Sequence, residues 1–521
     1  MTENLRSLAL QAAAGSTASA DPDYPLVHLA PEVGRLNDPN GLLISSGAYH
    51  AFYQYTPMHG TRRLVYWGHA SSRDTLHWEH HEPAVVPDSA YDANGAYSGN
   101  AIVLEDSEVA EAPSRAPYQL FYTGNVKDPL TDERTASQCL VTSDDLVTFT
   151  KWPANPLLPT HAPGYTAHFR DPQVMRDPQR PGTFRMLLGV QREDETGAAL
   201  LYRSQDLLSW ELDGELSFPD AAGRLDALGY MWECPGLVTL TDELTGEEWD
   251  VLIFCPQGAS SEEADGYTTV FPCVYTVGHL VGTELRDCDG TLRQVDHGFE
   301  FYAPQVFARR PCEPGPVLLS GWAGNAGQDE QPSIGTGGWV HCLTVPRELS
   351  LRGGRLIQRP AAVLADDAPL LEASCPGTGA GPAELDVLAG HRCWHLALDL
   401  EQAGDGRGRD PGDGQDAVRL TIGDEECFVE VALTLGPEPR LVINRERSRY
   451  HDPEAVREVA LEPGTSPRLE VLHDRSVTEV FVGDGDLAAT FRSFVTPTAS
   501  GARLACQGAV RVARARAVTF D

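Results

Sequence analysis

Short runs in which apolar and polar residues alternate recur through the first two thirds of the chain. Each run is rich in aromatic and β-branched side chains and is bounded by glycine, proline, aspartate or asparagine, a pattern typical of β-strands joined by turns. The clearest runs are residues 49–55, 118–123, 184–190, 249–254 and 316–320. They recur about every 60 to 70 residues, and no segment has a long amphipathic helical pattern. The pattern therefore predicts an all-β fold.

A short phrase of the form Ser-x-Asp-x-x-x-aromatic repeats within this region. It occurs at residues 72–78, 143–149 and 204–210. An internal repeat of this kind is typical of β-propellers, in which each blade is built from several strands. Five periods fit residues 24–345, so the sequence predicts a five-bladed β-propeller there.

The remainder of the chain has a different character. Residues 346–382, which begin Pro-Arg-Glu-Leu-Ser and contain a Gly-Gly pair, are interpreted as a linker. Alternating runs resume at residues 393–400, and residues 383–521 are predicted to form a β-sandwich. Residues 404–415, rich in Gly, Asp, Arg and Pro, are expected to be a loop. Residues 1–23 are interpreted as a disordered or surface-lying lead-in.

A chain of 521 residues is long enough for two domains. Its net charge of −35 argues against nucleic acid and anionic membranes as partners, because both bind basic surfaces. No apolar run approaches the ~18 residues of a membrane span, and no secretion signal is recognised. Eleven cysteines without Cys-x-x-Cys spacing favour buried thiols in a reducing cytoplasm over a disulfide framework or a zinc site. Those in apolar surroundings are Cys139, Cys234, Cys255, Cys273 and Cys342. The oligomeric state stays open.

Three short acidic motifs carry the candidate chemistry. Asp38 lies in Asn-Asp-Pro-Asn-Gly, Asp171 in Phe-Arg-Asp-Pro and Glu233 in Trp-Glu-Cys-Pro. Taken singly, the first motif fits a tight turn and the second a plain Arg–Asp ion pair, whereas the third has no specific meaning. A pair of carboxylates, however, is what cleavage of a glycosidic bond requires, and a third can hold the sugar. The motifs lie far apart in sequence, so only the fold can bring them together.

Together with the segments around them, these motifs resemble glycoside hydrolase family 32, which contains β-fructofuranosidases, invertases and sucrose-6-phosphate hydrolases. The supporting segments, in the order typical of the family, are residues 53–55, 67–69, 97–99, 121–124, 301–305 and 338–349. The resemblance is strong over residues 25–360 and weaker over residues 471–485. It implies a five-bladed β-propeller with the active site in its axial funnel, a following β-sandwich, and chemistry that needs neither metal nor cofactor.

The resemblance also implies a role for each carboxylate. Asp38 would attack the anomeric carbon of fructose and form a fructosyl-enzyme ester. Glu233 would protonate the leaving oxygen and then activate water, while Asp171 would bind fructose hydroxyls and stabilise the transition state. A general acid must keep its proton, so we expect an apolar or anionic setting for Glu233, with Trp232 and Cys234 beside it. Carboxyl groups about 5 to 5.5 Å apart lead to retention of configuration, and we expect that distance between Asp38 and Glu233.

The substrate-binding residues that the resemblance implies are polar or aromatic. They are Asn37, Gln54, Trp67, Tyr97, Ser98, Arg170, Tyr302 and Trp322. Amides, hydroxyls and a guanidinium suit a polyhydroxylated ring, and the indole of Trp67 or Trp322 can pack on its apolar face. Core packing is the alternative for both tryptophans.

The sequence departs from the family at three positions. Arg35 and Arg62 stand where the family commonly has tryptophans that line the pocket mouth, and Glu300 stands where it commonly has aspartate. Because arginine binds phosphate through a bidentate pair, Arg35, Arg62 and the adjacent Arg63 are candidates for contacting the leaving group or the phosphate of sucrose 6-phosphate. The alternative is that they are solvated surface arginines.

The leading hypothesis is a cytoplasmic retaining glycosidase that cleaves terminal β-D-fructofuranosides, namely sucrose, sucrose 6-phosphate or short fructo-oligosaccharides. A fructosyltransferase would use the same covalent intermediate but pass the fructosyl group to a sugar instead of water. An enzyme that degrades levan or inulin is another alternative within the family. A non-catalytic sugar-binding propeller is the alternative from a different class, because a fold does not dictate a function.

Overall fold

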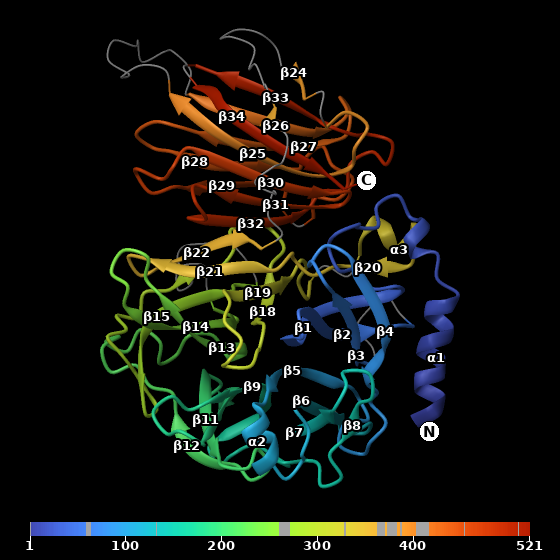
Figure 1. Ribbon diagram of the computed structural model, residues 1–521, viewed down its shortest axis with the longest axis vertical. Coiled ribbons are helices and arrows are strands. Elements are labelled where there is room, and N and C mark those ends of the chain that lie inside the picture. The colour runs from blue at the N-terminus through green and yellow to red at the C-terminus, as the bar shows by residue number, and fades with distance from the viewer. Residues whose placement is uncertain are drawn as a thin grey trace.

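The computed structural model describes residues 2–58, 64–131, 133–259, 271–327, 330–361, 370–371, 383–385, 388–402, 416–452, 454–508 and 510–520. These residues form seven β-sheets and few helices (Figure 1), which confirms the all-β prediction. The helices are α1 (Thr2–Ala14), the 3-10 helix η1 (Ala18–Ala20), α2 (Asp106–Glu111) and α3 (Pro332–Thr336). In the described part of the chain, no helix is long and apolar enough to cross a membrane.

Five sheets follow one another between residues 34 and 360. The first contains β20 (Trp339–Val340), β1 (Gly34–Ser45), β2 (Ala48–Thr56), β3 (Tyr66–Ser72) and β4 (Trp78–Val85). The second contains β5 (Ala96–Val103), β6 (Tyr118–Lys127), β7 (Arg134–Ser143) and β8 (Thr150–Lys151). The third contains β9 (Tyr165–Arg176), β10 (Phe184–Arg192), β11 (Gly197–Ser204) and β12 (Glu211–Glu215). The fourth contains β13 (Met231–Thr241), β14 (Glu248–Gln257), β15 (Val274–Val281), β16 (Glu284–Arg286) and β17 (Arg293–Gln294). The fifth contains β18 (Tyr302–Val306), β19 (Val317–Trp322), β21 (Arg347–Arg352) and β22 (Arg355–Pro360).

The five sheets surround a common centre. Their first strands β1, β5, β9, β13 and β18 contact one another in that order, and β18 returns to β1. The ring is also closed by β20, which comes late in this region yet pairs in parallel with β1 through Trp339 and Gly34. Figure 1 shows the sheets around this centre, coloured from blue to yellow. Side chains of the first strands can therefore meet although they are far apart in sequence.

The Ser-x-Asp repeat forms one type of turn three times. It begins on the last residue of the third strand of a sheet and leads into the fourth strand. In the second sheet, Ser143 Oγ accepts a hydrogen bond from the N–H of Leu146 at 2.9 Å, and Asp145 Oδ1 accepts from the next two N–H groups. The same bonds recur at residues 72–77 and 204–209. Short polar side chains that bind the local backbone thus determine this turn.

The C-terminal third of the chain forms two six-stranded sheets. One contains β23 (Leu370–Leu371), β34 (Val510–Thr519), β25 (Cys393–Gln402), β30 (Arg468–Asp474), β31 (Val477–Val482) and β32 (Leu487–Arg492). The other contains β24 (Ala383–Glu384), β33 (Ala502–Gln507), β26 (Ala417–Gly423), β27 (Phe428–Thr434), β28 (Arg440–Asn444) and β29 (Val456–Ala460). Both sheets contribute to one core of buried Leu, Val, Ile and Phe side chains. The loop expected at residues 404–415 lies outside the described residues.

The linker expected from residue 346 onward is wrong in its first part. Residues 347–360 form the hairpin of β21 and β22, which belongs to the fifth sheet. Its two-residue turn is Gly353-Gly354, and both glycines have positive φ angles. A Gly-Gly pair favours a tight hairpin turn because glycine adopts positive φ without a steric cost.

The lead-in is ordered from its second residue onward. Residues 2–14 form α1, which packs against β4, and Arg6 donates a hydrogen bond to the backbone carbonyl of Pro83 at 2.7 Å. Its alanines and leucines have high helix propensity. The helix was not expected because its sequence lacks a strong amphipathic pattern.

The cysteines divide into two groups. The five cysteines singled out from the sequence are free and buried, as expected. Cys506, in contrast, is disulfide-bonded, so the expectation of thiols alone is wrong for this residue.

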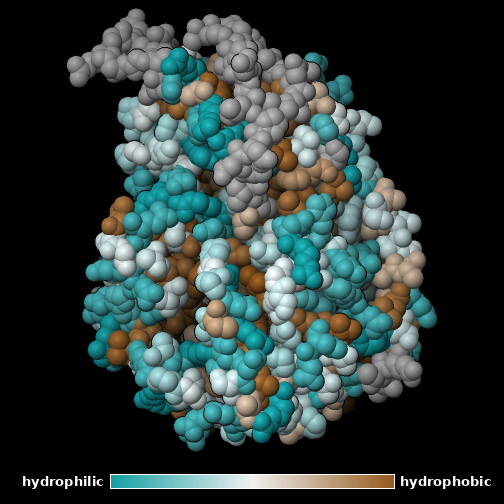
Figure 2. Space-filling view, viewed as in Figure 1, coloured by the Kyte–Doolittle hydropathy of each residue, from teal (hydrophilic) through white to brown (hydrophobic). Residues whose placement is uncertain are grey.

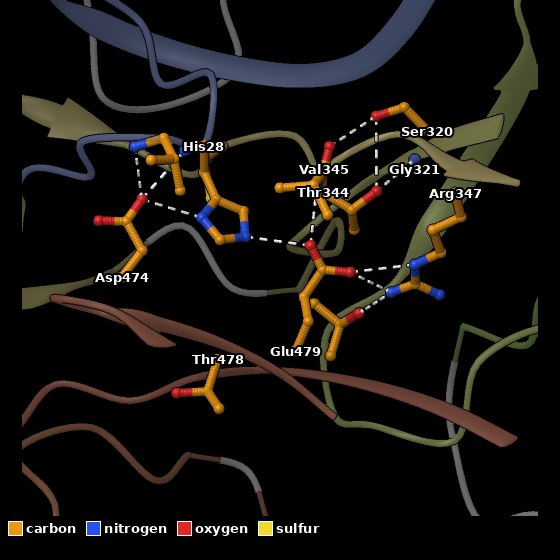
Figure 3. Close-up of polar contacts among 12 residues, drawn as sticks. His28, Ser320, Gly321, Thr344, Val345, Arg347, Asp474, Thr478 and Glu479 are labelled. Carbon is orange, nitrogen blue, oxygen red and sulfur yellow. Dashed lines mark hydrogen bonds and ion pairs between the residues drawn. The ribbon is translucent and has the colours of Figure 1, made fainter. Parts of the chain in front are cut away.

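Buried charged side chains join the C-terminal sheets to the rest of the protein (Figure 3). On the surface, hydrophilic residues cover most of the face shown in Figure 2. Asp474 accepts hydrogen bonds from the N–H groups of residues 26–28 and from the His28 ring, the last at 2.9 Å. Glu479 binds the other ring nitrogen of His28 at 3.0 Å and Arg347 at 2.6 Å. All four side chains are fully buried. Burial alone would lower the pKa of His28, but the bonds to Asp474 and Glu479 raise it to about 9.

A second buried pair has the opposite polarity. Glu300, just before β18, accepts hydrogen bonds from Arg445 Nη1 at 2.7 and 3.0 Å and one from the backbone N–H of Arg492 at 2.7 Å. The side chains of Glu300 and Arg445 are fully buried. The departure from the family at Glu300 therefore concerns the contact between the two regions of the protein.

We expect the His28→Gln variant to unfold at a lower urea concentration than the wild type. Removing one partner leaves two buried carboxylates undercompensated, which costs about 3 to 5 kcal/mol. Because the pKa of His28 is about 9 in the fold and about 6.5 when unfolded, the stability gained from its charge is present below pH 6.5. That gain is lost as the pH rises through 9.

Urea unfolding of wild type and variant at pH 6 and pH 9.5 checks this expectation. The matched control is His77→Gln, since His77 pairs with Asp74 on the surface with 77% of its side chain exposed. An equal difference between wild type and His28→Gln at both pH values would contradict the charged state of His28.

Candidate active site

Each of the five central strands is interrupted near the middle of the ring by a shift in pairing register, as in a β-bulge. The shifts fall at residues 36–39 of β1, 97–99 of β5, 170–173 of β9, 233–236 of β13 and 302–305 of β18. A bulge bends a strand and redirects the side chains beside it. The three acidic motifs all lie at such bulges.

A cavity of about 220 Å³ lies where these strands meet. It is lined by Asp38, Gln54, Tyr97, Arg134, His168, Arg170, Asp171, Tyr230, Glu233, Gln257, Tyr302, Trp322 and Ala326. Trp322 and Tyr302 are 0% and 3% exposed, whereas Tyr230 is 41% exposed. The cavity therefore has a closed floor near Trp322 and Tyr302 and an open mouth near Tyr230, and it holds all three predicted carboxylates.

Asp38 is held by three side-chain donors. Ser98 Oγ and Gln54 Nε2 donate to Oδ2 at 2.5 and 2.9 Å, and Asn37 Nδ2 donates to Oδ1 at 3.2 Å. Asn37 also donates to Gln54 Oε1 at 2.7 Å, so the donors orient one another. Donors of this kind stabilise a carboxylate in its charged form and fix its direction. Asp38 is therefore an oriented anion on the wall of the cavity.

Glu233 is held by a cation and a phenol. Arg170 Nη2 donates to its Oε1 at 2.7 Å, and the Tyr302 hydroxyl donates to its Oε2 at 2.7 Å. The Glu233 side chain is 18% exposed. The carboxyl group is thus fixed in direction while its edge stays open to the cavity.

The expected surroundings of Glu233 are present in part. Asp171 and Asp38 supply the anionic setting, because all three carboxylates line the same cavity. Trp232 does not contribute: its ring points into the core, where its centroid lies 4.4 Å from that of Phe254. Neighbouring residues of a strand point to opposite faces, so Trp232 and Glu233 cannot share the cavity.

Asp171 is the most enclosed of the three carboxylates. Its side chain is 5% exposed, and its Oδ2 accepts a hydrogen bond from the N–H of Cys234 at 3.0 Å. Burial raises the pKa of Asp171 to about 7; nearby Arg170 opposes this shift, and the charge of Glu233 adds to it. Asp171 therefore changes its protonation state near neutral pH.

Arg170 links two of the carboxylates. Its Nη2 lies 2.7 Å from Glu233 Oε1, and its Nε lies 3.8 Å from Asp171 Oδ2. Its Nη1 binds His168 Nδ1 at 2.9 Å. The simple ion pair with Asp171 suggested by the sequence is therefore the longer of two contacts, and the pair with Glu233 is the closer.

Most of the predicted binding residues reach the cavity. Gln54, Tyr97, Arg170, Tyr302 and Trp322 line it directly. Asn37 and Ser98 are absent from the lining but bind Asp38, as described above. These seven residues therefore either face the cavity or orient a carboxylate within it.

Trp67 is placed differently from the expectation. It is fully buried, its Nε1 donates to the backbone carbonyl of Tyr97 at 3.0 Å, and its ring packs against Phe52 and Tyr122. It does not line the cavity. Of the two alternatives weighed for Trp67, the structure shows core packing, in which the indole supports the strand that carries Ser98.

Of the two arginines that stand where the family commonly has tryptophans, the structure describes only Arg35. Arg35 is fully buried, and its guanidinium carbon lies 5.2 Å from the centroid of Trp322. It supports the floor of the cavity from behind and is not a solvated surface arginine. Arg62 and the adjacent Arg63 lie outside the described residues.

Five lining residues were not predicted from the sequence: Arg134, His168, Tyr230, Gln257 and Ala326. His168 and Tyr230 each lie three residues before a motif carboxylate, so proximity in sequence could have found them. Gln257 is opposite Met231 in the register of β13 and β14, which only the strand pairing reveals. Arg134, at the start of β7, carries no signal in its local sequence.

The arrangement provides an oriented anion, a second carboxyl group fixed by two donors, and a third with a pKa near neutrality. Two carboxyl groups around one cavity can attack and protonate a glycosidic bond. In the described residues, no group of three or more His, Cys, Asp or Glu side chains could hold a metal ion. The geometry therefore fits a glycosidase.

Comparison with known proteins agrees with this chemistry. Residues 28–360 match the model of the glycosyl hydrolases family 32 N-terminal domain, and residues 438–519 match that of the family 32 C-terminal region. A sucrose-6-phosphate hydrolase of Klebsiella pneumoniae is 42% identical over 345 residues, which are 66% of this chain and 68% of that protein. One from Bacillus subtilis (strain 168) is 39% identical over 347 residues, which are 66% of each protein.

Solved structures extend the similarity to the whole chain. That of a sucrose-6-phosphate hydrolase from Lactobacillus gasseri has a TM-score of 0.78 at 26% identity and covers 99% of this chain and 96% of that one. A mutant β-fructofuranosidase from Bombyx mori, in complex with sucrose, has a TM-score of 0.74 at 25% identity and covers 100% and 97%. The family models, the curated relatives and the folds agree with one another: this chain belongs to glycoside hydrolase family 32.

Proposed function

We propose that the protein is a retaining β-fructofuranosidase that cleaves sucrose and sucrose 6-phosphate through a covalent fructosyl-enzyme ester. The observation that carries the proposal is the pair of fixed carboxyl groups, Asp38 and Glu233, on the wall of one cavity. The names of the relatives support both substrates, because two are sucrose-6-phosphate hydrolases and one structure holds sucrose.

The reaction follows from the position of each group. A carboxylate oxygen of Asp38 attacks the anomeric carbon of the fructosyl unit, while Glu233 gives its proton to the glycosidic oxygen of the leaving sugar. Glu233 then removes a proton from water, which attacks the same carbon and releases fructose and the Asp38 carboxylate. Asp171, between the two, accepts hydrogen bonds from fructose hydroxyls and stabilises the positive charge that develops on the ring.

We further propose that the five sheets are the blades of a five-bladed β-propeller with the cavity on its axis, followed by a β-sandwich. The closed cycle of first strands and the two facing C-terminal sheets support this architecture. A cytoplasmic location is part of the same proposal and is supported by the buried free thiols of the described residues.

A panel of sucrose, sucrose 6-phosphate, kestose, inulin and levan tests the substrate range. We expect turnover of the first two sugars and little or none of the polymers, because the sugar units of a polymer beyond the leaving sugar would lie outside a cavity of about 220 Å³. Formation of longer fructosides at high sucrose would favour the fructosyltransferase alternative.

The Asp38→Asn variant should lose about 10⁴-fold or more in kcat/KM for sucrose, because an amide cannot form the ester. Glu233→Gln should lose about 10² to 10⁴-fold with sucrose, and far less with a fructoside of an acidic phenol, whose leaving group needs no proton. Initial-rate assays measure both, with the exposed Asp144→Asn as the matched control. Intact sucrose cleavage by Asp38→Asn would refute the mechanism.

Retention of configuration can be measured with methanol as the acceptor in place of water. Two displacements at the same carbon should give methyl β-D-fructofuranoside from sucrose, identified by NMR. This outcome corresponds to the carboxyl separation of about 5 to 5.5 Å expected for a retaining enzyme. The α-anomer as the product would exclude a covalent ester on Asp38.

The Asp171→Asn variant should be inactive but more stable than the wild type at alkaline pH. The pKa of Asp171 is raised from 3.8 to about 7, so its ionisation destabilises the fold progressively as the pH rises through this interval. The advantage of the variant should grow by roughly 2 to 3 kcal/mol between pH 5 and pH 8. Thermal unfolding at both pH values measures it, and a variant that is less stable at pH 8 would show that Asp171 is stabilised as an anion.

A further inference from the structure

A phosphorylated sugar meets an electrostatic problem at this cavity. Three carboxylates line it, the whole chain carries a net charge of −35, and a sugar phosphate carries a charge near −2 at neutral pH. Two guanidinium groups line the same cavity, those of Arg170 and Arg134. Arg170 is already engaged by Glu233 at 2.7 Å and by Asp171 at 3.8 Å, so its charge is balanced inside the cavity.

Arg134 is different. It is the first residue of β7, it is half-buried, and its guanidinium carbon lies 6.0 Å from the ring centroid of Tyr97. Within the described parts of the chain, its side chain makes no hydrogen bond or ion pair. The planar fork of donors of its guanidinium can bind phosphate through two parallel bonds.

Arg134 also lies toward the open mouth of the cavity, where the proposed reaction places the leaving sugar. The floor is formed by buried residues, whereas Arg134, His168 and Tyr230 are half-buried or exposed. Burial, with the charges of Arg170 and Arg134, lowers the pKa of His168 to about 4. Arg134 and His168 line the same cavity.

Neutral polar groups accompany this cation. Because Arg170 Nη1 donates to His168 Nδ1 at 2.9 Å, a neutral His168 carries its proton on Nε2. The Tyr230 hydroxyl donates to Gln257 Oε1 at 2.9 Å, and this bond orients the phenol at the mouth. The mouth thus combines an uncompensated guanidinium with an imidazole N–H and a phenol.

We infer that Arg134 binds the phosphate of a phosphorylated leaving sugar and is the residue that gives the enzyme a preference for sucrose 6-phosphate over sucrose. The inference rests on the proposed function, since it assigns a residue to the leaving-group half of that site. Arg134 takes the role for which the sequence offered Arg35 and Arg62, because Arg35 is buried behind Trp322.

The test is the ratio of kcat/KM for sucrose 6-phosphate to that for sucrose. In Arg134→Ala this ratio should fall about 10- to 100-fold, as expected for a lost charge-assisted contact, mainly through the KM for the phosphorylated sugar. Arg134→Lys keeps the charge without the fork and should fall in between. The matched control is Arg180→Ala, because Arg180 is exposed between β9 and β10, away from the cavity.

Inhibition of sucrose cleavage supplies a second readout. Glucose 6-phosphate should inhibit the wild type more strongly than glucose does. In Arg134→Ala, the two sugars should inhibit sucrose cleavage equally. If Arg134→Ala fails to fold in a thermal unfolding control, Arg134→Lys and the two inhibitors carry the test.

The outcomes separate the two proposals. A wild type that cleaves sucrose but whose substrate ratio shifts less than about threefold in both Arg134 variants overturns the role of Arg134 and leaves the proposed function standing. A wild type that cleaves neither sugar overturns both.

Discussion

The candidate active site depends on a break in the hydrogen-bond ladder of the innermost strands. In a regular strand, neighbouring side chains point to opposite faces, so a carboxylate and the residue after it cannot both be used at the axis. At the bulges, Asp171, Cys234 and Ala303 adopt positive φ angles of 64°, 47° and 47°, a conformation that non-glycine residues adopt at a cost. Each is followed by a proline, which has no N–H to leave unpaired where the ladder is interrupted. The same device therefore acts in three sheets to aim chemistry at one point.

Opposing charges hold this point together. Arg170 lies between Glu233 and Asp171, and the thiol of Cys234 lies 3.7 Å from Asp171 Oδ2 and 4.0 Å from Asp38 Oδ2. Burial and the neighbouring carboxylates raise the pKa of this thiol well above its usual value, so Cys234 fills the space between two anions without adding a third charge. A site of this kind is unstable on its own, and the rigid ring of sheets around it supplies the compensation.

The sequence predicts those features of the structure that short segments determine by themselves. The all-β class, the repeated turn and the three carboxylates follow from local patterns, such as Ser143 and Asp145 binding their own turn. Trp67 and Arg134 could not be placed in this way. The direction of Trp67 depends on which side of β3 faces the cavity, and Arg134 reaches the mouth only because the second sheet stands next to the third. The hairpin at residues 347–360 could not be distinguished from a linker, because a Gly-Gly pair suits either structure.

In the buried network of His28, Arg347, Asp474 and Glu479, charged side chains of one region are compensated by charged side chains of the other. In this network the C-terminal sheets contribute Asp474 and Glu479 and the N-terminal region contributes His28 and Arg347, so separating the two parts would expose charged side chains that are now fully buried. The C-terminal sheets therefore cannot be removed without exposing these charges. In the course of evolution they could be exchanged between enzymes of this kind only together with the segment around His28, more than 400 positions away in the chain and on the other side of the boundary.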